Sequence, residues 1–135
     1  MSILFEPLQV GALTLPNRIV MAPLTRLRGT PDHLPTPVMV EYYRQRASAG
    51  MIITEGTPVS PMGVGYAQVP GIWSREQTEL WKPITAAVHE AGGRILAQLA
   101  KQLHEAKTKN GGKPVRGLIS ICAAGGQGVA AILEA

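Results

Sequence analysis

Short apolar runs predict strands in the first half of the chain. Leu8–Val10 and Leu13–Leu15 flank a Gly-Ala pair, which favours a tight turn between two short strands. Arg18–Ala22 and Met51–Thr54 are almost continuously apolar. Runs of that kind are typical of strands buried on both faces, as in a parallel sheet.

Two segments with an apolar residue every three or four positions predict helices. The first begins at Thr36 and ends before Gly50, while the second opens with a capping box of Ser74 and Gln77 and ends at Gly92. The apolar positions are Val40, Tyr43 and Ala47 in the first helix, and Leu80, Ile84, Val88 and Ala91 in the second. Strand, helix, strand, helix is the order of an α/β protein.

Residues 94–106 admit two interpretations. Ile95–Leu99 could form a third strand, but the apolar residues of the whole segment also fall on one helical face, and the scarcity of β-branched residues favours the helix locally. Further on, Leu118–Cys122 and Val129–Leu133 predict a pair of strands that a hairpin could join.

The composition fits one globular domain. The chain has 135 residues, of which 45% are hydrophobic, so it can bury a core and a disordered tail is excluded. Only 16% are charged, against about 25% in an average soluble domain, so part of the surface is expected to meet another surface or further chain. The net charge of +4 comes from residues 94–135. Because no aromatic residue is interleaved there, a solvated face is favoured over nucleic-acid binding.

The cysteine content and the N-terminus bear on the cellular compartment. Cys122 is the only cysteine, so no internal disulfide can form. Residues 1–10 lack the pattern of a secretory signal, and the uncharged stretches 56–74 and 117–133 are interrupted by proline or glycine. We therefore expect a cytoplasmic protein that does not enter a membrane.

Candidate chemistry lies in two segments that follow predicted strands. In parallel α/β architectures, function gathers at the carboxyl ends of strands. Pro23–Arg26 and Glu55–Thr57 occupy such places and offer small or hydroxyl side chains, which suits a flat cofactor with polar edges. The spacing of these residues is also compatible with two ordinary turns that have no function. His33, His89 and His104 lack the spacing of metal ligands and are expected at the surface.

The residues in these segments carry a family resemblance. The matching segments are residues 5–8, 15–26, 53–57, 65–74 and 81–94. Together they strongly resemble the N-terminal part of old yellow enzyme flavoproteins, the NADH:flavin oxidoreductases, over about residues 1–99. The resemblance implies a partial (β/α)8 TIM barrel, an α/β fold represented here by its first two to three βα units. It also implies FMN as cofactor, NAD(P)H as reductant and hydride transfer to an activated alkene, a small-molecule substrate.

The resemblance also assigns site residues. The FMN-binding positions would be Pro23, Leu24, Thr25, Gly56 and Gln98. Thr25 would lie near the carbonyl edge of the flavin, Gly56 beside its rings where alanine is usual, and Gln98 at its pyrimidine edge. Tyr66 would flank the substrate.

The chain departs from the family pattern after Leu99. Ala100–Leu103 stand where an aromatic residue, histidine and Gly-Arg are usual, and later substrate-anchoring residues have no counterpart. A closed barrel needs about 250 residues, so we expect exposed strand edges and self-association through them.

Residues 94–135 resemble the C-terminal end of a thiolase. The Cys-x-x-Gly-Gly-x-Gly motif that begins at Cys122 carries this resemblance, which implies a helix followed by a strand pair. Cys122 would be the general acid/base and the amide of Ala124 an oxyanion-hole donor. We interpret residues 1–99 as part of a flavin-binding barrel and residues 100–135 as a thiolase-like tail. The alternatives to an oxidoreductase are a thiolase remnant, related to acyl-CoA acyltransferases, and a catalytically inactive chimeric fragment.

Overall fold

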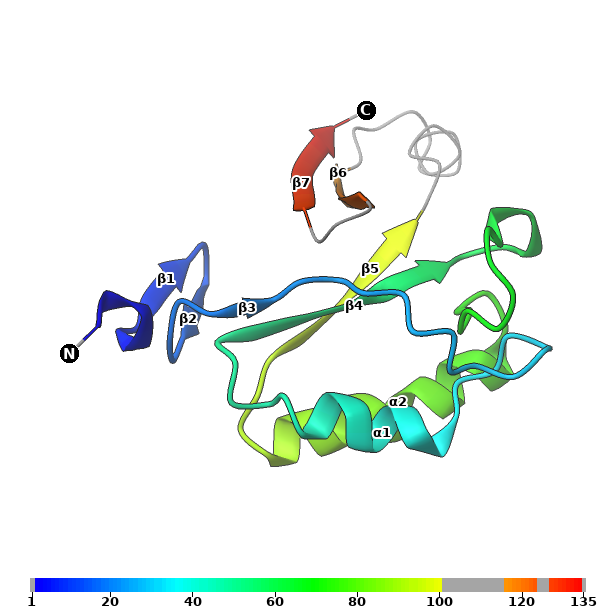
Figure 1. The fold of residues 1–135 in the computed structure, drawn as a ribbon, viewed down its shortest axis with the longest axis horizontal. Helices are drawn as coiled ribbons and strands as arrows, with labels where there is room; N and C mark the ends of the chain where they lie inside the picture. The colour runs from blue at the N-terminus through cyan, green and yellow to red at the C-terminus, as the bar shows by residue number, and fades with distance from the viewer. Residues whose placement is uncertain (1, 101–115, 124–126, 135) are drawn as a thin grey trace.

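The computed structural model describes residues 2–100, 116–123 and 127–134. The strands are β1 (Leu8–Val10), β2 (Leu13–Leu15), β3 (Val20–Met21), β4 (Met51–Pro58), β5 (Ile95–Ala100), β6 (Arg116–Ala123) and β7 (Gln127–Glu134). The helices are α1 (Pro37–Arg44) and α2 (Arg75–Glu90), with short 3-10 turns η1 (Ile3–Phe5) and η2 (Pro61–Gly63) (Figure 1).

A small hairpin precedes the main sheet. Strands β1 and β2 pair antiparallel, with Leu8 opposite Leu15. Gly11 in the turn has φ +57, a left-handed conformation that glycine adopts without steric cost. The predicted strand–turn–strand at the start of the chain is therefore confirmed.

A parallel sheet with strand order β3-β4-β5 forms the centre of the fold. Helix α1 connects β3 to β4 and helix α2 connects β4 to β5, and both helices lie together on one side of the sheet (Figure 1). This βαβαβ order confirms the predicted α/β fold with two complete βα units and the strand of a third.

Strand β5 settles the ambiguous segment. Ile95–Ala100 pairs in parallel with β4, beginning with Ile52 opposite Ile95. The helical interpretation is therefore wrong for residues 95–100, because pairing with a buried strand outweighs the local preference for helix. Its continuation, residues 101–115, lies outside the described residues. Strands β6 and β7 pair antiparallel, as predicted for the last two apolar runs.

Helix α1 ends earlier than predicted. Its last residue is Arg44, and Gly50 lies just before β4 instead of at the helix end. A Cβ on Gly50 would stand 2.1 Å from the backbone oxygen of Asn17. The Gly50 N–H donates to Asn17 Oδ1 at 2.8 Å. Glycine is needed there because two backbone segments cross at close range.

Helix α2 begins at the predicted capping box. Ser74 Oγ accepts the Gln77 N–H, and Gln77 Oε1 accepts the Ser74 N–H, both at 3.1 Å. Its buried residues are Gln77, Trp81, Ile84 and Val88. The predicted apolar face was wrong at Leu80 and Ala91, which are exposed. Helix α1 and strand β4 decide which side of α2 is covered, and Trp81 fills that side.

The hydrophobic core lies between the two helices and β4. Its buried members are Met39, Tyr43, Ala47, Ile52, Trp81, Ile84 and Val88. Strand β4 is largely buried, as predicted, but β3 is not, since Val20 is 41% exposed. Strand β3 is an edge strand with β4 on one side, so the expectation of two buried faces fails there. Within the described residues, no helix is long and apolar enough to cross a bilayer.

Candidate functional site

Strand β4 continues through a segment predicted as loop. The register with β5 passes from Ile53 opposite Leu96 to Gly56 opposite Gln98, so β4 carries one extra residue. This is a β-bulge. The Gln98 N–H donates to Thr54 Oγ1 at 2.9 Å, which gives that backbone group a side-chain acceptor at the bulge. Glu55–Thr57 are therefore strand residues, a correction to the predicted loop.

Three predicted site residues line one pocket at the carboxyl ends of β3 and β4. The pocket has a volume of about 160 Å³ and is lined by Thr25, Gly56, Pro58, Gly63, Gly65, Tyr66 and Val69. Thr25 comes from the segment after β3, Gly56 from β4, and Tyr66 from the segment after β4. The fold thus brings together Thr25 and Tyr66, which lie 41 positions apart in the sequence.

Gly56 faces open space. A Cβ at this position would meet no heavy atom within 4 Å, and its φ is not left-handed. The glycine is therefore not required by turn geometry or by neighbouring chain. Gln98 lies directly opposite it on β5 and is half-buried. A planar group could approach the backbone of β4 at this place.

The other two predicted cofactor residues lie beside the pocket. Pro23 is buried and Leu24 is 41% exposed, and neither lines the pocket. Both lie in the segment between β3 and Thr25, so their predicted contact with FMN stays a prediction.

Two loops form the wall around Val69. The Gly29 N–H donates to the Gln68 carbonyl at 2.9 Å, and the Gly71 N–H donates to the His33 carbonyl at 2.8 Å. The ring Nδ1 of His33 lies 2.9 Å from the Val69 carbonyl oxygen. His33 is thus a half-buried bridging residue, which corrects its predicted place at the surface. His89 is exposed as predicted, and His104 lies outside the described residues.

Glu55 is a functional candidate that the sequence analysis did not single out. Its side chain is 1% exposed, and its Oε2 accepts the Arg26 N–H at 3.1 Å. Burial raises the pKa of Glu55, although the N–H groups of Arg26 and Leu27 oppose that shift. The available signal was a carboxylate directly after the predicted buried strand Met51–Thr54.

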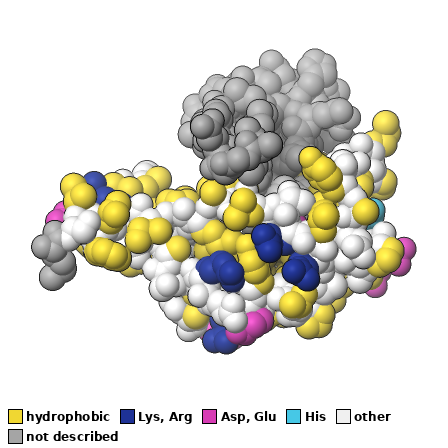
Figure 2. Space-filling view, in the orientation of Figure 1, with side chains coloured by type: hydrophobic (Ala, Val, Ile, Leu, Met, Phe, Trp, Pro, Cys, Tyr) yellow, Lys and Arg dark blue, Asp and Glu magenta, His cyan; other side chains and the backbone are white. Residues whose placement is uncertain are grey.

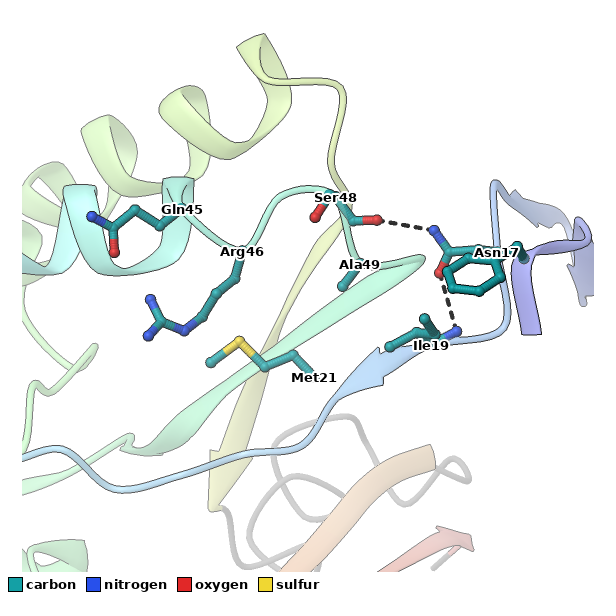
Figure 3. A pocket seen from close by; sticks show the side chains of 8 residues that line it. Asn17, Ile19, Met21, Gln45, Arg46, Ser48 and Ala49 are labelled. Atoms are coloured by element: carbon teal, nitrogen blue, oxygen red, sulfur yellow. Dashed lines mark hydrogen bonds between the residues drawn. The ribbon is translucent and has the colours of Figure 1, made fainter. Parts of the chain in front are cut away.

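A larger pocket lies near the amino ends of β3 and β4. It measures about 510 Å³ and is lined by Phe5, Asn17, Ile19, Met21, Gln45, Arg46, Ser48 and Ala49 (Figure 3). Asn17 Nδ2 donates to the Ser48 carbonyl at 2.9 Å, and its Oδ1 accepts the Ile19 N–H at 3.1 Å. None of the predicted site residues lines it. Chemistry in parallel α/β folds gathers at the opposite, carboxyl ends of the strands, so the smaller pocket is the candidate site.

The surface next to the larger pocket is basic. The guanidinium groups of Arg46 and Arg26 lie 4.1 Å and 5.7 Å from the centroid of the Tyr42 ring. Figure 2 shows Lys and Arg side chains gathered at the centre of this view, with hydrophobic side chains around them. In the described part of the chain, no carboxylate forms a salt bridge with the guanidinium group of Arg26 or Arg46.

Cys122 is described through its backbone alone. It lies in β6 opposite Gly128 of β7. Its predicted role as an acid/base thiol therefore stays a prediction. Among the residues described, no three His, Cys, Asp or Glu side chains gather in a way that could hold a metal ion.

Comparisons with known proteins agree on one family. The model of the NADH:flavin oxidoreductase / NADH oxidase family matches residues 3–128. An NADP-dependent oxidoreductase of Aspergillus flavus is 52% identical over 101 residues, which are 73% of this chain and 27% of the relative. A probable flavin mononucleotide-dependent alkene reductase of Leishmania infantum is 43% identical over 97 residues, 72% of this chain and 27% of the relative.

A solved structure gives the same result for the fold. The old yellow enzyme homologue of Zymomonas mobilis aligns with a TM-score of 0.71 and 60% identity over 73% of this chain and 28% of that one. The chain thus spans about a quarter of the length of the curated relatives it matches. Its parallel sheet with two helices is part of an α/β TIM barrel. The family match runs past residue 99, and the proposed boundary there stays a prediction. From residue 3 to residue 128, the chain belongs to the NADH:flavin oxidoreductase / NADH oxidase family.

Proposed function

We propose that this chain supplies one wall of an FMN site in an NAD(P)H-dependent alkene reductase. The observation that supports this most directly is the convergence of Thr25, Gly56 and Tyr66 on one pocket at the carboxyl ends of β3 and β4. The names of its relatives, which include an NADP-dependent oxidoreductase and a flavin mononucleotide-dependent alkene reductase, agree with it.

The residues present fit such a cofactor. The open space at Gly56 leaves room for a flat ring against the strand backbone. The Thr25 hydroxyl can donate to a ring carbonyl, and the Gln98 amide can both donate and accept at a pyrimidine edge. Pro23 and Leu24 would cover one side of the ring, and the Tyr66 ring, 67% exposed, would flank the substrate. The chemistry that FMN supplies when bound is relay of a hydride from NAD(P)H to an activated alkene.

The pocket is too small to be a complete site. Its volume of about 160 Å³ falls below the range of about 300–1,000 Å³ that is usual for ligand pockets. Since the chain spans about a quarter of its curated relatives, we propose that turnover requires the barrel units that lie outside this match.

Flavin titration tests the proposal. Adding FMN to the purified chain should quench flavin fluorescence and shift its absorption band. Thr25→Val, which keeps the side-chain shape but removes the hydroxyl, should weaken binding by about fivefold to tenfold, the contribution of one hydrogen bond. Thr25→Ser should bind like the wild type. Binding that is absent, or equal in all three proteins, contradicts an FMN site at Thr25.

A thiolase-like tail is the second candidate, and we propose it for residues 100–135. What supports it is the antiparallel pair β6–β7, in which Cys122 lies opposite Gly128. An acid/base thiol would be alkylated by iodoacetamide faster than free cysteine near neutral pH. Alkylation at the rate of an ordinary thiol would argue against this role and favour a catalytically inactive fragment.

We propose self-association through the free edge of β3, with a second copy of the chain as the occupant. The support is that β3 has β4 as its one neighbour among the described strands, and that Ile19 and Val20 are 40% and 41% exposed. Val20→Lys should shift the chain toward monomer in sedimentation velocity, whereas Val38→Lys, at an exposed position on α1, should not. Equal sedimentation of both variants would contradict a β3 interface.

We also propose that the protein works in the cytoplasm. The support is the single cysteine, Cys122, which cannot form an internal disulfide. Fractionation of cells that express a tagged chain tests this, and recovery in a secreted or membrane fraction would contradict it.

A further inference from the structure

Glu55 is a buried carboxylate for which the proposed site chemistry has no use. It lies in β4 one residue before Gly56, and its Oε2 accepts the Arg26 N–H at 3.1 Å. The N–H of the next residue, Leu27, is close enough to lower the pKa of the same carboxyl group. One side chain of β4 therefore holds the backbone of the loop after β3 at Arg26.

The loop needs such a partner because its backbone is strained. Leu27 has φ 56, a left-handed conformation that is unfavourable for a residue with a Cβ. Strained residues persist only where surrounding contacts outweigh their cost. The Glu55 carboxyl group provides such a contact at Arg26, the residue directly before Leu27, and hydrogen bonds to an ionised acceptor are stronger than those to a neutral one.

Tyr43 of α1 holds Glu55 from the other side. Its hydroxyl accepts the Glu55 N–H at 3.1 Å, and its ring is fully buried. Burial raises the pKa of Tyr43, so the hydroxyl stays protonated. Glu55 thus connects α1, β4 and the loop after β3.

These contacts meet at the candidate site. Thr25 immediately precedes Arg26, and Gly56 immediately follows Glu55, so a bond between residues 29 positions apart joins two walls of the pocket. We propose that Glu55 is a positioning residue that holds Pro23–Thr25 against Gly56, so that the Thr25 hydroxyl and the Gly56 backbone face the same ring. This inference rests on the proposed FMN site.

The chemistry of the side chain explains why a carboxylate is needed. A glutamate offers acceptors on both oxygens, whereas glutamine has one oxygen and an NH₂ group that would face a backbone N–H. Glu55→Gln therefore keeps the shape but replaces an acceptor with a donor. Glu41→Gln is the matched control, because Glu41 lies exposed on α1, pairs with Arg44 and does not touch the pocket.

The test combines FMN titration with amide exchange of the full chain. Glu55→Gln should weaken FMN binding about tenfold, the cost of one charge-assisted hydrogen bond, and should speed exchange at the Arg26 and Leu27 amides. The β4 amides should keep their protection, which separates loop positioning from general loss of structure. Glu41→Gln should change neither quantity.

Two results would overturn the inference. One is wild-type FMN affinity in Glu55→Gln together with faster exchange at Arg26 and Leu27, and the other is unchanged exchange at both amides. If Glu55→Gln does not fold, Tyr43→Phe serves as the test variant instead. It should weaken FMN binding by a smaller factor than expected for Glu55→Gln. Wild-type affinity in Tyr43→Phe would then be decisive against the role. If the wild type binds no FMN, the proposed function fails, while the exchange rates still decide whether Glu55 positions the loop.

Discussion

At the residue scale, the candidate site depends on two neighbours in β4 with opposite surroundings. Glu55 is buried and binds the loop after β3, whereas Gly56 faces open space, with no heavy atom within 4 Å of the place that a Cβ would occupy. The bulge at Thr54 makes this possible because it inserts an extra residue and breaks the regular alternation of faces. A buried acceptor and an open backbone surface are thereby placed side by side.

Substituting Gly56 with side chains of increasing size tests whether a flat ring lies against it. Gly56→Ala should raise the free energy of unfolding by about 0.5–1 kcal/mol, because alanine in a strand costs less conformational entropy and its Cβ meets nothing. Gly56→Leu should instead fill the pocket and abolish FMN binding while the chain stays folded. Urea denaturation and flavin titration measure the two effects. Retained FMN binding in Gly56→Leu would show that the ring does not lie against β4.

Glu55 should give stability a characteristic pH dependence. Burial raises its pKa above the ordinary value of 4.5, so the folded state holds this proton to higher pH than the unfolded chain. The contribution of this bound proton to the free energy of unfolding is therefore fully present below pH 4.5. It is lost as the pH rises through the raised pKa of Glu55. Relative to Glu55→Gln, the wild type should lose stability as the pH rises above 4.5 and through the raised pKa of Glu55.

Urea midpoints at several pH values measure that difference. Glu41 is the control, and its effect on stability should have the opposite pH dependence, because its bonds to Arg44 and Gln45 lower its pKa. Its contribution is present above the ordinary value of 4.5 and is lost as the pH falls through the lowered pKa. A pH-independent difference between the wild type and Glu55→Gln would contradict a raised pKa at Glu55.

At the element scale, the sheet and its crossovers are positioned by close backbone contacts. The strand β4 begins where Gly50 passes Asn17, and the segment after α2 passes Ala47, whose backbone oxygen would lie 2.8 Å from a Cβ on Gly93. Helix α2 is held at its start by the Ser74–Gln77 box, and Trp81 Nε1 donates to the Gly71 carbonyl at 3.0 Å. The ends of α2 are thus held by the neighbouring connecting segments as well as through the core.

Gly50→Ala tests the crossing next to β4. The added Cβ would stand 2.1 Å from the Asn17 oxygen, so one backbone must move, and the free energy of unfolding should fall by about 1–3 kcal/mol. Gly65→Ala is the control, because its Cβ would meet nothing within 4 Å and should change stability by less than about 0.5 kcal/mol. Thermal or urea unfolding gives both values. Equal stability of the two variants would mean that the crossing relaxes without cost.

At the scale of the whole molecule, the described strands β3, β4 and β5 form an open sheet. Strand β3 has one neighbour among the described strands, and the larger pocket and the arginines around Tyr42 lie beside it. The Zymomonas mobilis homologue has more than three times the matched length, since the alignment covers 28% of it. Barrel closure in such a protein brings further βα units against both sheet edges.

Fragment complementation tests what the open sheet lacks. Coexpression with the part of the Zymomonas mobilis homologue outside the matched 28% should give a complex that binds FMN more tightly than this chain alone. The reason is that the added units would cover β3 and complete the ring site. Size-exclusion chromatography with flavin absorbance measures it. Separate elution of the two polypeptides, with no flavin in either, would contradict complementarity of the β3 edge.

The sequence by itself determined the local elements and the residue types of the site. The Ser74–Gln77 box and the turn at Gly11 specify their structures through contacts within a few residues, and the apolar run Met51–Thr54 predicts a buried strand by its composition. Thr25, Gly56 and Tyr66 were identified by family resemblance, and they line one pocket in the fold.

Only the tertiary structure decided the features that depend on distant chain. Ile95–Ala100 is a strand because β4 offers it backbone partners, and Gly50 is needed because Asn17 crosses it. Glu55 became a candidate once the fold placed the Arg26 N–H against its carboxyl group. The physical reason is the same in each case: a hydrogen bond or steric contact between remote residues leaves no periodic trace in the sequence, because neither partner alone encodes the distance between them.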